Sequence, residues 1–355
     1  MIPYQVSTLP WLEPQWRQMI ERGQALPHAV LLNGKAGIGK LALAFGIARV
    51  LLCRRESGRE PCGNCTSCIL LDSGTHPDLH LLTTEQQLER GEGLVPAYGA
   101  RYSAPATTTK GRHTRVSEII GVDTIRALTG KLSSTAGQGL RKVALIYPAD
   151  AMNINAANAL LKFLEEPTPA THLLLITADP FQLPATVRSR CSRLEVAAPE
   201  TAVALAWLER LTNNFSEDAK NLLQQGWGPL EIADLVTELP AGGYRTLYQT
   251  VLTSTAEEDA AGALTAVLEQ LGARRAMRWL QHSMLSAMRQ QATLTQDLQG
   301  SAQPKANVNR HRCAALFRLA GQFRRWPHGA VDETLFLEDI SSQLQAPRGK
   351  GDYDL

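Results

Sequence analysis

Short apolar runs alternate with helix-like patterns over the N-terminal half of the chain. Four of the runs are as long as buried strands, and they lie at 29–32, 79–82, 142–146 and 173–177. Their residues are apolar almost throughout, without an alternating polar position, which is typical of strands covered on both faces. Buried strands among helices predict an α/β fold.

Apolar residues at intervals of three and four predict helices between and after these runs. The clearest such segments are 4–26, 122–132 and 152–166. Asn153 is a suitable N-terminal cap for the third segment, and Pro167 ends it. Beyond Pro199 the pattern remains helical to the C-terminus, with breaks at glycine and proline. The C-terminal part of the chain is therefore predicted to consist of helices.

The first strand is followed by a glycine-rich loop at 34–40 and then by a helical pattern. This order of strand, loop and helix is the context in which the spacing GxxxxGK forms a phosphate loop. The backbone N–H groups of such a loop and the N-terminus of its helix bind phosphate groups. The candidate nucleotide-binding residues are Gly34, Gly37, Gly39 and Lys40. A strand–turn–helix that uses glycine only for its turn is the alternative interpretation.

Four of the six cysteines follow the phosphate-loop helix directly, at Cys53, Cys62, Cys65 and Cys68. In a reducing compartment such a cluster indicates a metal site before disulfides. Thiolates at this spacing can form a tetrahedral Zn²⁺ site, and four of them leave no open position for catalysis, so the zinc is expected to be structural. Four unrelated buried thiols are the alternative. The nearby His76 and His80 are expected to be surface or turn residues, because four thiolates already complete the site.

Length and charge limit the classes of protein that remain. The chain has 355 residues, enough for two or three domains, and a net charge of +2. This charge argues against nucleic-acid binding over the whole surface and leaves room only for a local basic patch. No apolar run approaches the length of a membrane span, and the first residues do not form a signal peptide. The protein is therefore expected in the cytoplasm.

Residues 85–113 differ from the rest of this half of the chain, because they have almost no apolar periodicity. They are expected to form a mobile loop inserted into the domain. Four basic residues follow Gly99, namely Arg101, Lys110, Arg112 and Arg115. They offer a possible contact with DNA, but a solvated loop is the favoured interpretation.

The order of these motifs resembles that of bacterial clamp-loader subunits of the AAA+ superfamily. The resemblance covers roughly residues 4–235 and rests on Ala29 to Leu41, on the four-cysteine insert, and on three further segments. Those segments are Ala156 to Pro167, Leu183-Pro184, and Ser189-Arg190-Cys191. The resemblance implies an AAA+ P-loop module with a zinc-binding insert, a small helical lid and a helical C-terminal domain.

The resemblance also implies domain boundaries. Residues 1–198 would form the nucleotide-fold domain, which contains the zinc insert at 53–68 and the mobile loop at 85–113. Residues 199–240 would form the lid. Residues 241–355 would form a helical collar through which subunits associate in a ring.

Three departures from the active members of this family indicate a subunit that does not hydrolyse ATP. Leu41 stands where a hydroxyl residue binds Mg²⁺. Tyr147 and Pro148 replace the acidic pair at the end of the strand 142–146, and Glu231 stands where the lid carries an arginine that senses the γ-phosphate. Because Gly39 and Lys40 are retained, binding of ATP, ADP or phosphate remains open.

The resemblance further implies that Arg190, within the triplet formed with Ser189 and Cys191, is an arginine finger that acts on the ATP site of a neighbouring subunit. A guanidinium supplied in this way stabilises charge on the transferring phosphate. The alternative is that Arg190 only pairs with a nearby carboxylate.

The function implied by the resemblance is loading of the sliding clamp onto primed DNA as part of the bacterial DNA polymerase III holoenzyme, with no ATPase or polymerase activity in the chain itself. The implied partners are gamma/tau-type ATPase subunits, the clamp-opening delta subunit, the sliding clamp and primer–template DNA, in a hetero-oligomeric ring. Two alternatives remain, an active ATPase subunit of the same ring and a zinc-dependent DNA-binding module.

Overall fold

The computed structural model describes residues 5–22, 25–55, 60–91, 93–102, 117–134, 136–137, 141–211 and 216–238, together with 277, 281, 317–318 and 321. The chain divides into two compact units. The first comprises Met1–Arg210 and Gly228–Glu231, and the second Leu211–Trp227 and Ile232–Leu355. The expected collar domain at 241–355 lies almost entirely outside the described residues, so it stays a prediction.

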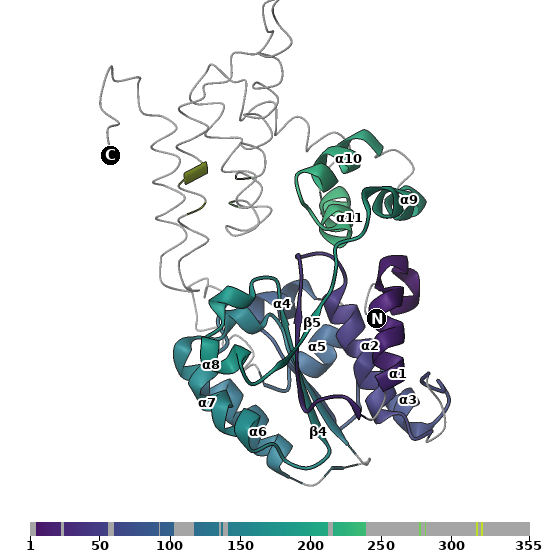
Figure 1. Ribbon diagram of the computed structural model, residues 1–355. Coiled ribbons are helices and arrows are strands. Elements are labelled where there is room, and N and C mark those ends of the chain that lie inside the picture. The colour runs from purple at the N-terminus through teal and green to yellow at the C-terminus, as the bar shows by residue number, and fades with distance from the viewer. Residues whose placement is uncertain are drawn as a thin grey trace, which may run out of the picture. The chain divides into compact units, whose positions relative to one another are not determined.

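A parallel five-stranded sheet forms the centre of the first unit (Figure 1). Its strands, in chain order, are β1 (Ala29–Asn33), β2 (Leu79–Leu82), β3 (Lys142–Ile146), β4 (Thr171–Thr177) and β5 (Ser192–Glu195). Their order across the sheet is β2-β3-β4-β1-β5, and every neighbouring pair is parallel. The four strands predicted from the apolar runs are confirmed. The edge strand β5 was not predicted, because only Leu194 among its residues is buried.

Helices cover both faces of the sheet (Figure 1). One face carries α6 (Val122–Ser133), α7 (Ile154–Glu165) and α8 (Ala185–Arg188), and the other carries α1 (Glu13–Arg22) and α2 (Lys40–Leu52). Alternate strand residues such as Leu173 and Leu175 share one buried cluster with Leu128 of α6 and Leu160 of α7. The α/β fold predicted from the sequence is therefore confirmed.

The segment expected to be a mobile loop, 85–113, is helical over most of the part that the structure describes. It contains α4 (Glu85–Arg90), capped by the hydroxyl of Thr84, and α5 (Leu94–Gly99). Tyr98 of α5 is fully buried, so the expectation of a loop was wrong for 85–102. Each helix has only six residues, too few to establish a helical period in the sequence. Residues 103–113 lie outside the described part of the chain.

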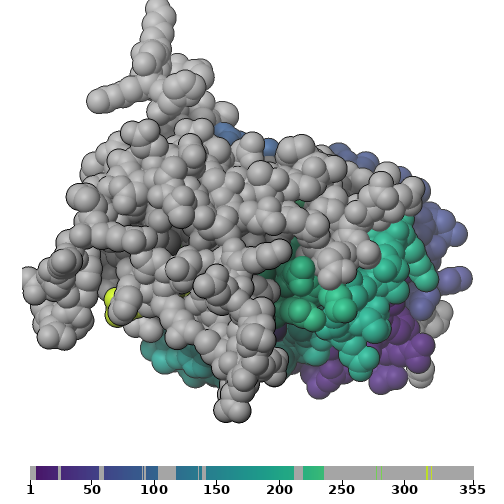
Figure 2. Space-filling view, turned by 90° about the horizontal axis from the view of Figure 1, so that it is seen from above, coloured from purple at the N-terminus to yellow at the C-terminus, as the bar shows by residue number. Residues whose placement is uncertain are grey.

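Short 3₁₀ turns complete the first unit: η1 (Val6–Thr8), η2 (Pro10–Leu12), η4 (Ala149–Ala151) and η5 (Pro180–Gln182). The helix α9 (Thr201–Leu211) is tied to the N-terminal turns, since the indole N–H of Trp207 donates to the carbonyl of Thr8 at 2.8 Å and its ring meets that of Trp11 edge-on at 5.3 Å. Figure 2 shows the N-terminal segment as purple atoms at the lower edge of the coloured region.

The second unit is described only in part. It contains α10 (Ser216–Gln224) and most of α11 (Pro229–Glu238), and both are helices as expected for 199–240. The domain boundaries themselves stay predictions. Within the described residues, none of the helices combines the length and the apolar character that a bilayer span requires.

Candidate functional site

The phosphate loop lies between β1 and α2, as the sequence predicted. α2 begins at Lys40, directly after two glycines with left-handed backbone, Gly37 at φ +68° and Gly39 at φ +90°. Residues with a Cβ rarely adopt these angles, so the loop depends on glycine at both positions. The N-terminus of α2 therefore opens onto the loop in the manner of an anion-binding helix.

Lys40 is buried and turned back onto its own loop. Its side chain is 6% exposed, and its Nζ donates to the carbonyl of Gly34 at 2.7 Å and to the carbonyl of Lys35. These contacts hold the ammonium at the loop. The next residue, Leu41, brings an aliphatic side chain to the position where a hydroxyl would bind Mg²⁺.

Residues Gly228–Glu231, which belong to the first unit, lie against the loop. The N–H of Leu230 donates to the carbonyl of Gly37 at 2.9 Å. A Cβ on Gly37 would come within 2.6 Å of the Glu231 side chain, and one on Gly228 within 2.2 Å of the carbonyl of Ala36. Two backbone segments thus approach so closely that side chains cannot fit between them.

The carboxylate of Glu231 adds negative charge at this contact. One of its oxygens, Oε2, accepts from the N–H of Gly228 at 3.2 Å and would lie 3.0 Å from a Cβ on Gly37.

The N-terminal segment also packs against the loop. The indole N–H of Trp11 donates to the carbonyl of Ile38 at 2.9 Å, and Leu9 lies against Gly39. The loop is thus packed against protein from two parts of the chain.

The carboxyl ends of β3 and β4 carry the remaining groups near the loop. Tyr147 and Pro148 follow β3, and neither offers a carboxylate. The nearest carboxylate in sequence, that of Asp150 in η4, accepts from the hydroxyl of Thr177 at 2.5 Å. Neither Asp150 nor Thr177 was among the predicted site residues. Thr177 is the last residue of β4 and Asp150 comes four positions after β3, so the signal available was a polar residue near the carboxyl end of a buried parallel strand.

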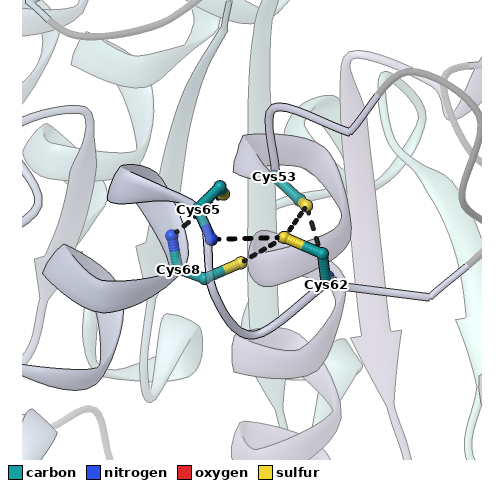
Figure 3. Close-up of side chains that lie close together, drawn as sticks. All are labelled: Cys53, Cys62, Cys65 and Cys68. Atoms are coloured by element: carbon teal, nitrogen blue, oxygen red, sulfur yellow. Dashed lines mark hydrogen bonds between the residues drawn. The ribbon is translucent and has the colours of Figure 1, made fainter.

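The four clustered cysteines come together at the end of α2 and the start of α3 (Thr66–Asp72), as Figure 3 shows. Their ligand atoms all lie within 4.8 Å of one another. The sulfur of Cys62 is 3.6 Å from that of Cys53 and 4.0 Å from that of Cys68. With Zn–S bonds of about 2.3 Å, a regular tetrahedron places its sulfurs about 3.8 Å apart. The donor set and its spacing therefore fit a tetrahedral metal ion.

Backbone N–H groups support this cluster in the way that metal-binding thiolates require. The N–H of Cys65 donates to the sulfur of Cys62 at 3.4 Å, and the N–H of Cys68 to the sulfur of Cys65 at 3.5 Å. Burial alone would raise the pKa of Cys65, but backbone donors at Arg54 and Cys68, with the neighbouring thiols, lower it to about 6. Backbone N–H groups also lower the pKa of Cys62. Both shifts favour the thiolate form, whereas burial raises the pKa of the Cys68 thiol.

The two neighbouring histidines are not surface residues, so that expectation was wrong. His76 is 1% exposed, and its Nε2 lies 2.7 Å from the hydroxyl of Ser67, while its Nδ1 accepts from the N–H of Asp78. His80 is 7% exposed, and its Nδ1 is hydrogen-bonded to the hydroxyl of Tyr102. The burial of His76 was not predictable from the sequence, because its partner Ser67 lies in α3, whereas His80 lies in the run 79–82 that was predicted to be a buried strand. As expected, neither histidine belongs to the cysteine cluster.

Within the triplet 189–191, Arg190 is exposed at the surface and Cys191 is buried. Cys191 is 8% exposed within the core cluster, and burial raises the pKa of its thiol to about 11, so it is an inert packing residue. The hydroxyl of Ser189 donates to the carbonyl of Thr186 at 3.1 Å. Arg190 lies at the surface and pairs with Glu165, with 2.6 Å between Nη2 and Oε1. Arg190 therefore has a carboxylate partner, Glu165, as the alternative interpretation of this residue expected.

A parallel sheet with a phosphate loop after β1, together with a four-cysteine cluster, defines a P-loop nucleotide-fold protein with a potential metal site. Residues 11–200 match the family model described as "DNA polymerase III, delta subunit". The chain belongs to this family. Its similar relatives carry the name DNA polymerase III subunit delta'.

The similarity to individual relatives covers part of each chain. The protein from Pseudomonas aeruginosa is 41% identical over 223 residues, which are 62% of this chain and 59% of that protein. The Escherichia coli protein is 36% identical over 212 residues, 59% of this chain and 54% of its own. The Haemophilus influenzae protein is 30% identical over 260 residues, which are 64% of this chain and 70% of that protein. The alignments with the first two relatives thus span little more than half of their lengths.

A solved structure of a gamma-subunit-related protein of DNA polymerase III from Thermotoga maritima also aligns with this chain. The alignment covers 94% of this chain and 98% of that one, at 14% sequence identity and a TM-score of 0.46.

Proposed function

We propose that this protein is a delta-prime-like subunit of a bacterial DNA polymerase III clamp loader that does not hydrolyse ATP itself. In this role it helps to load the sliding clamp onto primed DNA, within a ring that also contains gamma/tau-type ATPase subunits and the delta subunit. Membership of the family and the names of the relatives support the proposal.

The proposal that this protein does not hydrolyse ATP rests on the residues of the phosphate loop and on what packs against it. Hydrolysis needs Mg²⁺ held by a loop hydroxyl and an acidic strand end, and Leu41, Tyr147 and Pro148 supply neither. In addition, Leu230 is hydrogen-bonded to the loop and Glu231 brings a negative charge to it. A negative charge at this point opposes the binding of phosphate.

The cysteine cluster is proposed to hold a structural Zn²⁺ through Cys53, Cys62, Cys65 and Cys68. The spacing of the sulfurs supports this, and so do the N–H groups that favour thiolates. Four protein ligands leave no position for substrate, so the ion would stabilise the segment between α2 and α3.

Arg190 is proposed to act in trans on the ATP site of a neighbouring ATPase subunit, with Ser189 and Cys191 fixing its position in the chain. Exposure of its side chain at 36% supports this assignment, because a residue that acts across an interface must be accessible in the free subunit. The guanidinium would stabilise charge on the transferring phosphate.

Reconstitution tests the proposal. The chain is mixed with the ATPase subunits, the delta subunit, the clamp and primed DNA, and ATP turnover and clamp loading are measured with wild type and with Arg190→Ala. The variant should assemble and keep its metal, yet lose turnover at the shared site by about 10³-fold or more. Total turnover should fall several-fold, because other sites in the ring keep their own arginines. Failure of the chain to enter the ring would refute the proposed role, and wild-type rates with Arg190→Ala would refute the trans-acting finger.

A further inference from the structure

The position of Arg190 on the surface is set by one acidic residue from another helix. Glu165 is the last residue of α7, and its Oε1 accepts from both Nε and Nη2 of Arg190, at 2.9 and 2.6 Å. The carbonyl of Thr186 accepts from Nη1 at 2.9 Å. The guanidinium is thus held on two sides by groups that lie far apart in the sequence.

These contacts use only part of the hydrogen-bonding capacity of the guanidinium. It has five N–H donors, and the three contacts leave one N–H on each of the two terminal nitrogens. Two N–H groups on the terminal nitrogens suit two oxygens of one phosphoryl group. Glu165 therefore orients Arg190 without consuming the donors that a phosphate would need.

Stability does not explain the presence of a carboxylate at position 165. The side chains of Arg190 and Glu165 are 36% and 52% exposed, and ion pairs of this kind contribute about 0 to 1 kcal/mol. Glu165 also lies at the C-terminal end of α7, where the helix dipole disfavours negative charge. Its interaction with Arg190 is the favourable contact that this carboxylate makes among the described residues.

We propose that Glu165 is a positioning residue that holds Arg190 in the orientation needed to reach phosphate on a neighbouring subunit. This inference rests on the proposed trans-acting role of Arg190. Glu165 itself would not touch the nucleotide. With glutamine at this position the charge is lost and the two-donor contact weakens, so the guanidinium would spend less time in the productive orientation.

A matched pair of variants tests the proposal in the reconstituted loader. Glu165→Gln removes the negative charge from the partner of Arg190, whereas Glu166→Gln makes the same chemical change one residue further along. Glu166 is exposed and makes no described hydrogen bond or ion pair with Arg190. Both variants relieve the same unfavourable charge at the end of α7, so a difference between them reports the contact with Arg190.

The measurement is ATP turnover with clamp and primed DNA, resolved into kcat and KM for ATP. Misplacement of a group by about 1 Å can lower a rate by about a hundredfold, so Glu165→Gln should reduce turnover at the Arg190-dependent site by about ten- to a hundredfold. The KM for ATP should change less than about twofold, because the finger acts on charge that develops in the transition state. Glu166→Gln should behave as wild type.

The double variant Glu165→Gln/Arg190→Ala separates the possible outcomes. If Glu165 acts through Arg190, this variant should turn over ATP at the same rate as Arg190→Ala alone. A low rate for Arg190→Ala beside a wild-type rate for Glu165→Gln would overturn the positioning role and leave the proposed function standing. An equal loss from Glu165→Gln with and without Arg190 would assign Glu165 to the fold instead. Wild-type turnover with Arg190→Ala would overturn the finger and the positioning role together.

Discussion

Acidification should weaken the part of the sheet that contains β2, because a neutral histidine is buried there. His80 is 7% exposed, and its Nδ1 lies 2.6 Å from the hydroxyl of Tyr102. Burial, with a smaller contribution from the guanidinium of Arg101, lowers the pKa of His80 from 6.5 to about 4. In the unfolded chain the imidazole has its ordinary pKa, about 6.5.

The direction of the effect follows from the order of protonation. As the pH falls, the unfolded chain takes up the proton before the folded one, so protonation favours unfolding. The stabilisation is complete above about pH 6.5 and is lost as the pH falls towards 4. The shift from 6.5 to about 4 corresponds to about 3 kcal/mol in total, of which about 2 kcal/mol is lost between pH 7 and pH 5.

Amide hydrogen exchange in β2 measures this loss, because it reports the free energy of opening of that segment. The experiment compares wild type with His80→Asn at pH 7 and pH 5. Asparagine retains an acceptor near the position of Nδ1 and does not titrate. Carboxylates, and the buried His76 and His172 whose pKa values are also lowered, are common to both proteins and cancel in the difference.

Wild type should lose about 2 kcal/mol more than His80→Asn between the two pH values. Tyr102→Phe should retain most of the pH dependence, because burial is the first cause of the shift and the hydroxyl contributes little to it. An equal fall in wild type and His80→Asn would show that the pKa of His80 does not differ between the folded and unfolded protein and would refute the argument.

Three further predictions concern the metal, the phosphate loop and α5. Elemental analysis of protein prepared without chelator should find about one zinc per chain, and Cys65→Ser should reduce it; an equal content of zinc in both would contradict the four-thiolate site. The isolated protein should hydrolyse ATP at the background rate, and steady turnover that disappears with Lys40→Ala would contradict this. Arg101→Ala removes bonds to the carbonyls of His76, Leu79 and Gly74, so the free energy of opening of α5 should fall by about 2 kcal/mol in hydrogen exchange. The exposed Arg17→Ala should change the opening of its own helix by less than about 1 kcal/mol, and similar losses from both would mean that the Arg101 contacts contribute little.

Elements with a strong local signal were predictable from the sequence. The central strands are buried along their whole length because helices cover both faces, and the apolar runs that result are visible without any structure. The phosphate loop and the cysteine cluster were predictable for a similar reason, since their residues lie within a few positions of one another.

Contacts between distant segments were not predictable in this way. Glu165 and Arg190 are separated by 25 positions, and Asp150 and Thr177 by 27, so neither pair forms a local motif. The sequence showed that a carboxylate partner for Arg190 was reasonable, but it did not identify which one. The helices α4 and α5 were missed because burial of Tyr98, rather than a long apolar stripe, holds this segment in place.

The approach of Gly228 to Ala36 and of Leu230 to Gly37 makes the present state of the phosphate loop difficult to reverse. Exchanging Leu41 for threonine would restore only one missing side chain. The backbone of 228–231 would still lie against the loop, and Glu231 would still repel an incoming phosphate. Opening this loop to phosphate therefore requires coordinated changes in two segments, 34–41 and 228–231, rather than the repair of one side chain.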